Sequence, residues 1–406
     1  MPLAFAREIA RIVLPRPKPA AQWLAAGVAI TAEWRGRHLL EVRPPNQADG
    51  VQALASLGPC LASLPELTGS AQPVLTIPHA LQPQVVRAAV VARALTGPVG
   101  RLSSLVEQLA LGDHAENALR GGILHVATLP SGTRLIGVSG ALLRYTTSGA
   151  WSIALRYTGF RKPARLGVLV DSLGRTWVGQ YSLNPKRDQI VNLYRSDDDG
   201  QNFAIVRSFE AGAIRHIHFI QQDPSDDSLW LGTGDNDRES GLWRSVDGEH
   251  WDCIGEGSQL WRAVGLAFVD DAVLWGTDAG TDADHFANVA VRWSRSTQRA
   301  EIEQLVHAPV HGIASVAGQR IVLATGCEGG ANESDAAVHV WLRSATGGWR
   351  QVASWAVGPQ PYRLQYAIAS FASGQAHSED LWVQLRGTAK MPLGIIKLAL
   401  DPAEWP

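Results

Sequence analysis

The chain has 406 residues, and its 36 Lys and Arg against 38 Asp and Glu give a formal net charge of -2 at pH 7. Because 46% of the residues are hydrophobic and 18% are charged, the chain can bury a large core, which excludes disordered and fibrous proteins. The near-neutral charge argues against a dedicated nucleic-acid-binding protein, which needs a basic face. Fifteen Trp against six Tyr indicate a regular feature that repeatedly requires an indole ring.

The cysteines and the N-terminus suggest a cellular compartment. Cys60, Cys253 and Cys327 are far apart, so they form neither a metal-binding spacing nor a closed disulfide framework. Residues 1–22 contain Arg7, Glu8 and Arg11 and lack the continuous apolar region of a secretory signal. No stretch offers about 18 uncharged apolar residues for a membrane span. We therefore expect a cytoplasmic protein without a membrane span, with secretion by another route left open.

The pattern of apolar residues in the first 120 residues differs from that in the rest of the chain. Alternating patterns predict short strands at 27–34 and 38–45. Apolar residues at three- and four-residue intervals, each run ending at Gly, predict helices at 85–97 and 101–121. The sequence thus predicts an N-terminal α/β or helical segment over 1–120, which either stands apart or supplies part of the fold that follows.

A repeat runs through the second part of the chain. An apolar strand ending in Arg-Ser recurs at Ser196, Ser245, Ser296 and Ser344, so successive serines are 49, 51 and 48 residues apart. A repeat of about 50 residues with roughly four short strands is typical of a β-propeller, whose blades stack because one blade cannot bury both faces. We predict an all-β propeller over 121–406, with six or possibly seven four-stranded blades.

Two repeats carry a turn pattern directly after the Arg-Ser pair. Residues 196–203 fit Ser-x-Asp-x-Gly-x-x-Phe, and residues 245–251 fit the same pattern with one residue fewer and Trp at the end. In such a hairpin Asp accepts hydrogen bonds from nearby backbone N–H groups, Gly takes a positive φ, and the aromatic ring fills the gap between blades. We therefore expect structural roles for Ser196, Asp198, Gly200, Phe203, Ser245, Asp247, Gly248 and Trp251.

Other indoles also fall on the period. Trp177, Trp230, Trp275 and Trp382 recur in the second strand of each predicted blade, where we expect them to pack between blades.

A set of cationic residues keeps the same register. The residues just before successive innermost strands are Arg165, Arg215, Arg262, His311 and Arg363, spaced by 50, 47, 49 and 52 residues. Innermost strands begin at the mouth of the central channel, so these side chains should converge there. They either pair with acids to hold blades together or form a ring that binds a carboxylate, sulfate or phosphate. Trp261, beside Arg262, is a candidate platform for a sugar ring.

The loops after the second strands should reach the same mouth, and they supply Tyr181, Asp235 and Asp278. A retaining hydrolase would use Asp235 or Asp278 as the acid, with a nucleophile about 5 Å away. A uronate lyase would neutralise a carboxylate with Arg215 or Arg262 while His216 or Tyr181 takes a proton. A non-catalytic binder would need neither, so all three possibilities stay open.

These patterns resemble a known superfamily. The two Asp-containing turns resemble the Asp-box, or bacterial neuraminidase repeat, and residues 121–406 resemble the sialidase-like propellers, which include glycoside hydrolases, polysaccharide lyases and non-enzymatic members. In sialidases an Arg in a Phe/Tyr-Arg-Ile-Pro motif binds the sialate carboxylate. Phe160-Arg161-Lys162-Pro163 stands at the corresponding place, with Lys in the third position, so the resemblance implies this role for Arg161, with Arg165 as the competing candidate.

The sequence therefore predicts a carbohydrate-active protein that acts on an acidic, uronate- or sialate-type glycan at the propeller mouth, as a hydrolase or a lyase. The alternative is a non-catalytic glycan- or protein-binding propeller associated with polysaccharide synthesis. No phosphate loop, dinucleotide fingerprint or zinc pattern is present, so no cofactor or metal is expected. Calcium is the one option, at the pairs Asp235/Asp237 or Asp282/Asp284.

Overall fold

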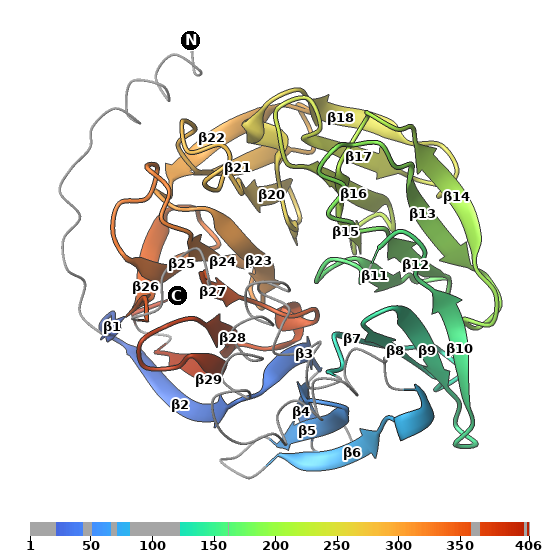
Figure 1. The fold of residues 1–406 in the computed structure, drawn as a ribbon. Helices are drawn as coiled ribbons and strands as arrows, with labels where there is room; N and C mark the ends of the chain where they lie inside the picture. The colour runs from blue at the N-terminus through green and yellow to red at the C-terminus, as the bar shows by residue number, and fades with distance from the viewer. Residues whose placement is uncertain are drawn as a thin grey trace, which may run out of the picture.

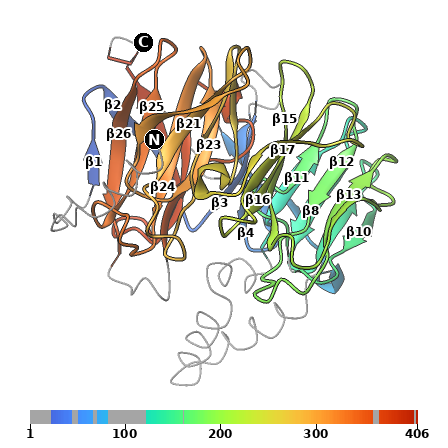
Figure 2. The same ribbon diagram turned by 90° about the horizontal axis from the view of Figure 1, so that it is seen from above.

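The structure, a computed structural model, describes residues 22–43, 51–65, 71–81, 122–160, 162–358, 366–401 and 404–405. The described residues form β-strands and a few short 3-10 helices, and the sheets stand side by side around a central axis (Figures 1 and 2). The predicted helices at 85–97 and 101–121 lie outside the described residues. In the described part of the chain, no helix has the length and apolar character needed to cross a bilayer.

Five four-stranded antiparallel sheets in the described residues are each built from four consecutive strands. The first contains β3 (His38–Val42), β4 (Val51–Leu57), β5 (Cys60–Pro65) and β6 (Gln72–Thr76). The second contains β7 (His125–Thr128), β8 (Arg134–Val138), β9 (Ala141–Tyr145) and β10 (Trp151–Arg156). The third contains β11 (Val168–Val170), β12 (Thr176–Gly179), β13 (Val191–Ser196) and β14 (Ala204–Phe209). The fourth contains β15 (His216–Gln222), β16 (Leu229–Gly234), β17 (Gly241–Ser245) and β18 (Asp252–Glu256). The fifth contains β19 (Ala267–Val269), β20 (Ala272–Gly276), β21 (Val289–Ser294) and β22 (Ala300–Leu305).

The sixth sheet has nine strands and contains both early and late parts of the chain. Its strands are β23 (Val310–Val316), β24 (Arg320–Cys327), β25 (Ala337–Arg343), β26 (Trp349–Ala356), β27 (Ala367–Ser370), β28 (Leu381–Arg386), β29 (Leu393–Leu400), β1 (Gln22–Leu24) and β2 (Val28–Arg35). β1 pairs with β26, and β2 pairs with β29. The ring is therefore closed by a strand from near the N-terminus beside one from near the C-terminus, the blue and red ribbons of Figure 1.

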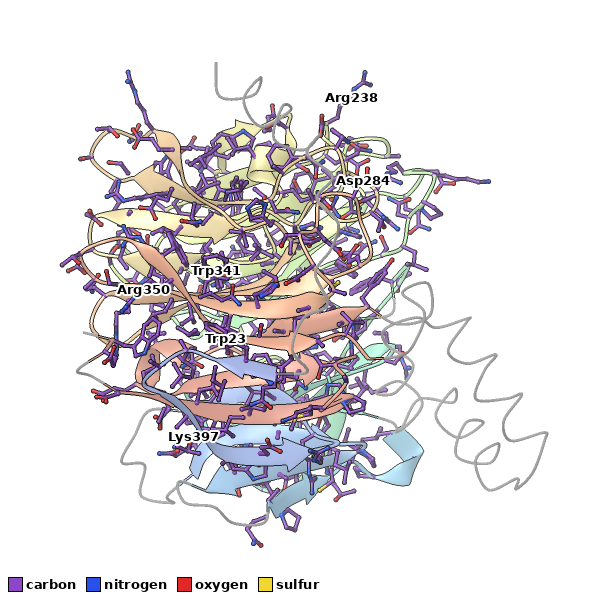
Figure 3. All side chains as sticks on the ribbon, turned by 90° about the vertical axis from the view of Figure 1, so that its left-hand side faces the viewer. Trp23, Arg238, Asp284, Trp341, Arg350 and Lys397 are labelled. Atoms are coloured by element: carbon purple, nitrogen blue, oxygen red, sulfur yellow. The ribbon has the colours of Figure 1, made fainter. Side chains whose placement is uncertain are left out.

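Side-chain contacts stabilise the junction between the N-terminal and C-terminal strands. Trp34 on β2 stacks on Trp382 of β28, with ring centroids 5.3 Å apart. Lys397 on β29, labelled in Figure 3, pairs with Asp380 at 2.8 Å and donates to Gln52 Oε1 at 3.0 Å. The predicted strands at 27–34 and 38–45 correspond to β2 and β3, so the strands before residue 121 take part in the same ring of sheets.

The core confirms the predicted packing of the repeated indoles. Trp177, Trp230, Trp275 and Trp382 lie on the second strands β12, β16, β20 and β28, and all four are fully buried. Trp177 and Trp382 each belong to a separate apolar cluster, whereas Trp230 and Trp275 share one. The regular spacing of Trp in the sequence therefore reflects one packing position repeated around the ring.

The two Asp-containing turns join third and fourth strands and have the expected hydrogen bonds. Asp198 Oδ1 accepts from the backbone N–H of Asn202 at 2.9 Å, and the N–H of Gly200 donates to Ser196 Oγ at 3.1 Å. Gly200 has φ 73°, and a Cβ there would lie 2.8 Å from Leu135 of the preceding sheet. Phe203 packs into the same cluster as Leu135.

The second turn repeats these contacts. Asp247 Oδ1 accepts from the N–H of His250 at 2.8 Å, and the N–H of Gly248 donates to Ser245 Oγ at 2.8 Å. Gly248 has φ 82°, and a Cβ there would lie 2.7 Å from the ring of Trp177 in the preceding sheet. Each turn is thus a rigid hairpin seated against the neighbouring sheet. The nearly all-β ring of antiparallel four-stranded sheets is a β-propeller.

Candidate functional site

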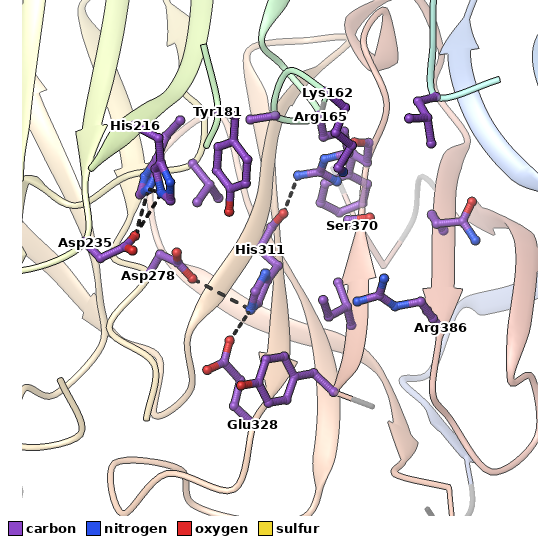
Figure 4. Close-up of a pocket in the computed structure, with 18 of the residues that line it drawn as sticks. Lys162, Arg165, Tyr181, His216, Asp235, Asp278, His311, Glu328, Ser370 and Arg386 are labelled. Atoms are coloured by element: carbon purple, nitrogen blue, oxygen red, sulfur yellow. Dashed lines mark hydrogen bonds and ion pairs between the residues drawn. The ribbon is translucent and has the colours of Figure 1, made fainter. Parts of the chain in front are cut away.

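A pocket of about 520 Å³ lies where the first strands of the sheets begin and the second strands end. These positions share one end of the ring because neighbouring strands are antiparallel. Of the residues expected there, Arg165, Tyr181, Arg215, His216, Asp235, Arg262, Asp278 and His311 all line the pocket. The fold thus brings together side chains that are far apart in the sequence, as Figure 4 shows for several of them.

One group of side chains joins two histidines of β15 to the acid that follows β16. His216 and His218 lie two residues apart on β15, so their side chains project from the same face of the strand, and both rings line the pocket. The Nε2 atoms of His216 and His218 are 3.1 Å apart, and they lie 3.2 and 3.1 Å from Asp235 Oδ1. All three residues are buried. We refer to them as the His-His-Asp cluster.

Burial and charge set the protonation of this cluster. Burial opposes ionisation of Asp235, but the contacts with His216 and His218 outweigh it and hold the pKa of this carboxyl well below its ordinary value. Burial lowers the pKa of His216 below its ordinary value. At neutral pH Asp235 is therefore a carboxylate and His216 a neutral imidazole.

A second group contains two carboxyls on either side of one histidine. His311 Nε2 lies 3.0 Å from Glu328 Oε1 and 3.7 Å from Asp278 Oδ1. Burial raises the pKa of Asp278, and within the described residues its Oδ1 atom is buried without a hydrogen bond. Burial acts in the same direction on Glu328, but the hydrogen bond from His311 outweighs it and lowers the pKa of Glu328. The two carboxyls therefore differ in proton affinity.

Arg262 separates the two groups. Its guanidinium lies 3.6 Å from Asp235 Oδ1 and 3.7 Å from Asp278 Oδ2, and it pairs with Asp282 Oδ1 at 2.9 Å. Its Nη1 atom also donates to the carbonyl oxygen of Asp235 at 2.8 Å. With three carboxyl groups around it, Arg262 contacts both groups and has little capacity left for a substrate anion.

The other arginines of the predicted ring have different partners. Arg215 pairs with Asp235 Oδ2 at 2.5 Å and donates to the carbonyl oxygen of Leu183. Arg165 donates to the carbonyl oxygens of Phe371, at 2.8 Å, and His311. Within the described residues Arg165 makes no ion pair with a carboxylate, and burial lowers its pKa to about 10. A cationic group therefore lies in the pocket wall without direct neutralisation.

Charge is unevenly distributed around the pocket. In Figure 4, Lys162, Arg165 and Arg386 lie on one side of His311, whereas His216, Asp235 and Asp278 lie on the other. We call the first set the cationic wall. The opposite wall, with its carboxyls and imidazoles, carries the groups that can exchange protons.

Tyr181 stands over the His-His-Asp cluster. Its ring stacks on that of His216, with centroids 4.0 Å apart. Burial, reinforced by the charges of Asp235 and Asp278, raises the pKa of the Tyr181 hydroxyl. The phenol therefore keeps its proton at neutral pH and can donate a hydrogen bond, but it is a poor base.

Glycines in the second strands make room for histidines of the first strands. A Cβ at Gly326 would lie 2.2 Å from the ring of His311, and one at Gly137 would lie 2.8 Å from the ring of His125. The repeated glycine near the end of these strands thus positions pocket side chains and does not mark a nucleotide-binding loop.

Several of the predicted site residues are absent from the described pocket lining. Trp261 is absent from the described pocket lining: its ring stacks on that of Trp275, with centroids 5.5 Å apart, and packs over Gly255, so its role as a sugar platform stays a prediction. The short 3-10 helix Gln259–Trp261 turns the ring toward the blade core. Arg161 and Arg363 lie outside the described residues. The eight turn residues, as expected, are absent from the described pocket lining.

The proposed calcium pairs do not share one centre. Asp235 faces the two histidines, whereas Asp237 Oδ1 accepts from Gln259 Nε2 at 3.0 Å. Asp282 pairs with Arg262, whereas Asp284 Oδ2 lies 3.5 Å from the backbone N–H of Ala331. The described contacts therefore give each acid a different partner and do not favour calcium.

Pocket residues that the sequence analysis does not single out include His125, Lys162 and Arg386. Arg386 ends β28, so it occupies the position equivalent to Asp235, Asp278 and Glu328 in other sheets. The period of the repeat could therefore have predicted the position of Arg386. His125 begins β7, where the first-strand register could also have located it.

Comparison with known proteins gives a fold and no family. No protein-family model matches the chain, and no curated protein matches it. A catalytically inactive histidine-to-alanine variant of virginiamycin B lyase from Staphylococcus aureus, solved with quinupristin, is similar in structure. Its TM-score is 0.55 at 14% identity, over 92% of this chain and 99% of the other. The GH74 xyloglucanase from Xanthomonas campestris has a TM-score of 0.49 at 16% identity, over 80% of this chain and 46% of the other.

Both identities are far below the level at which activity can be transferred. The likeness to the lyase supports the propeller fold alone, and the likeness to the xyloglucanase carries no argument. The chain is a β-propeller with a polar axial pocket, and its function has to be argued from the pocket residues.

Proposed function

We propose that the protein is an enzyme that hydrolyses an acidic, uronate- or sialate-type glycan in the axial pocket. The observation that carries this proposal is the pair Asp278 and Glu328, two carboxyls in one pocket with opposite pKa shifts. Such a pair is the arrangement that glycoside hydrolysis requires, one group to give a proton and one to act as an anion.

The spacing of the pair favours a particular mechanism. Ligand atoms of Asp278, His311 and Glu328 all lie within 4.8 Å of one another. Retaining glycosidases hold their two carboxyls about 5–5.5 Å apart, whereas inverting enzymes need about 6.5–9.5 Å for a water molecule. In the proposed reaction Asp278 protonates the leaving oxygen while Glu328 attacks the anomeric carbon, and a water molecule deprotonated by Asp278 then cleaves the sugar–Glu328 bond. His311 keeps Glu328 ionised through its 3.0 Å hydrogen bond.

The cationic wall supplies a reason for an acidic substrate. Lys162, Arg165 and Arg386 lie on the side of His311 opposite Asp278. A substrate carboxylate held there would neutralise Arg165, which pairs with carbonyl oxygens only among the described residues. Binding through a fixed charge would also orient the sugar ring against Asp278.

Elimination is the second candidate, and it rests on a different observation. Arg165 could neutralise a uronate carboxylate, and His216 is a neutral imidazole able to accept a proton. Tyr181, protonated and stacked on His216, would act as the acid. This reaction uses the His-His-Asp cluster instead of the carboxyl pair, so the two chemistries predict different sensitive residues.

A screen of acidic polysaccharides and sialosides tests the proposal. New reducing ends without the ultraviolet absorbance of an unsaturated uronate indicate hydrolysis. Reducing ends together with that absorbance indicate elimination. Binding with neither product supports a non-catalytic glycan-binding propeller, and an absence of both turnover and binding across the screen contradicts the acidic-glycan proposal.

We also propose the number of blades and a relationship to the Asp-box propellers. The nine-stranded sheet contains two consecutive groups, β23–β26 and β27–β29 with β2, which together with the five separate sheets favours seven blades. The hydrogen bonds of Asp198 and Asp247 support a divergent relationship to the Asp-box propellers. Mutation of these turns should leave the catalytic chemistry intact.

A further inference from the structure

Three potential metal-ligand atoms converge in the His-His-Asp cluster. The Nδ1 atoms of His216 and His218 lie 2.8 Å from the carbonyl oxygens of Ser182 and Ala263. Because a carbonyl oxygen can only accept, both Nδ1 atoms carry a proton, and both rings point their Nε2 atoms at each other and at Asp235 Oδ1. Two imidazole nitrogens and one carboxylate oxygen, all potential metal ligands, therefore converge in one buried place.

The distances fit a metal ion. An ion bound at about 2.1 Å holds neighbouring ligand atoms about 3.0 Å apart in an octahedral shell and about 3.4 Å apart in a tetrahedral one. The three distances within the cluster are 3.1, 3.2 and 3.1 Å. An ion at the centre could therefore contact all three atoms with little movement of the side chains.

The surroundings of the cluster match those of metal centres. Metal-binding histidines usually donate their second N–H to a carbonyl or carboxylate, which fixes the ring and its tautomer. Both histidines do so here, and Asp235 Oδ2 is held by Arg215 at 2.5 Å, which leaves Oδ1 for the ion. Arg262 lies 3.6 Å from Oδ1, beyond a hydrogen bond.

We propose that His216, His218 and Asp235 bind one divalent transition-metal ion, with zinc as the expected ion. Two imidazoles and a carboxylate are ligands that zinc accepts at catalytic sites, and three protein ligands leave a position for water or substrate. All three residues line the pocket, so that position is accessible from it. This site goes beyond the proposed hydrolysis, which uses Asp278 and Glu328, and it does not rest on that proposal.

The second group of potential ligands is less suitable. Asp278, His311 and Glu328 offer one imidazole, and the distance of 3.7 Å from His311 Nε2 to Asp278 Oδ1 is longer than any within the His-His-Asp cluster. Asp278 also has the guanidinium of Arg262 at 3.7 Å. This contrast provides a matched control within one pocket.

Metal content is the direct test. The full-length protein, with any histidine tag removed, is stripped with a chelator, incubated with zinc chloride, dialysed and measured by mass spectrometry. We expect about one zinc per chain in the wild type and in His311→Asn. We expect at least a tenfold weaker affinity in His216→Asn and Asp235→Asn, measured by competition with a chromophoric chelator.

A second measurement covers variants that fail to fold. The stripped wild type loaded with cobalt should show the visible absorption of a nitrogen- and oxygen-ligated ion, and stoichiometric zinc should abolish it and raise Tm. No bound ion in the wild type overturns the proposal. So does zinc binding that His311→Asn abolishes while folded His216→Asn and Asp235→Asn retain it. Activity of the enzyme enters neither readout, so failure of the proposed hydrolysis would leave this test unaffected.

Discussion

Gly234, at the end of β16, faces His218 of β15 so closely that a Cβ atom at Gly234 would lie 2.5 Å from Cε1 of the His218 ring. The ring cannot retreat easily, because its Nδ1 atom is bonded to the carbonyl oxygen of Ala263 at 2.8 Å. A missing side chain on one strand thus positions a functional side chain on its neighbour.

Gly234→Ala should displace His218 and disturb the His-His-Asp cluster. We expect a loss of about 1–3 kcal/mol in the free energy of unfolding, as for other overpacked cores, and weaker zinc binding. Urea unfolding and a zinc titration measure the two effects. Gly241→Ala on the adjacent strand is the control, since a Cβ there has its nearest neighbour at 3.2 Å. Equal zinc affinity in Gly234→Ala and the control would contradict the positioning role of Gly234.

His125 should make the fold sensitive to acid. Burial lowers the pKa of His125 in the folded protein to about 4, from an ordinary value of 6.5. The unfolded chain therefore binds the proton first, and stability present above pH 6.5 is lost as the pH falls toward 4, by at most about 3 kcal/mol. His125→Gln should lose less stability between pH 7 and about pH 5 in urea unfolding.

The exposed His250 provides the contrast for that measurement. Its hydrogen bond to Asp247 raises its pKa, so its contribution is present at low pH and lost as the pH rises. His250→Asn should therefore retain the acid-side loss of the wild type. An identical pH dependence in His125→Gln and the wild type would show that His125 does not cause the effect.

Much of this arrangement follows from the period of the sequence. The repeat of about 50 residues places Arg165, Arg215, Arg262 and His311 at one end of the ring, where they line the pocket. The period could not show their partners, because Arg262 meets Asp235 only after two neighbouring sheets are stacked.

Other features of the site could not be predicted from the repeat length. His216 and His218 lie two residues apart on β15, so alternation alone places both on one face, but the repeat does not show that Asp235, which follows β16, contacts both rings. Trp261 follows the sequence register, but a short 3-10 helix turns it onto Trp275. Contacts between sheets and single helical turns depend on tertiary packing, which a repeat length does not encode.

The Asp-containing turns should contribute to stability and not to catalysis. Asp198→Ala removes the acceptor for the backbone N–H groups of Asn202 and Gln201. Since the turn is exposed, we expect a loss of roughly 1 kcal/mol in thermal or urea unfolding. Turnover of any substrate found in the screen should stay at the wild-type level at a temperature where both proteins are folded. A selective loss of turnover would place Asp198 at the active site instead.

Closure of the ring depends on β2. Trp34 on this strand is 8% exposed and stacks on Trp382, so Trp34→Ala should cost about 3–5 kcal/mol, the range for large buried aromatic residues. Trp23→Ala is the control, because Trp23 is 43% exposed. Differential scanning calorimetry should show a large decrease in Tm for the first variant and a small one for the second. Similar values for both would mean that this junction does not stabilise the ring.

The rate of reducing-end release by Asp278→Asn, compared with the wild type on the best acidic glycan, tests the proposed hydrolysis most directly. Asp278 is the buried carboxyl with the raised pKa, so its replacement should lower kcat by roughly 10²–10⁴-fold. Asp284→Asn, in the same loop and outside the described pocket lining, should retain the wild-type rate. A wild-type rate in folded Asp278→Asn would contradict the central claim that this carboxyl donates the proton.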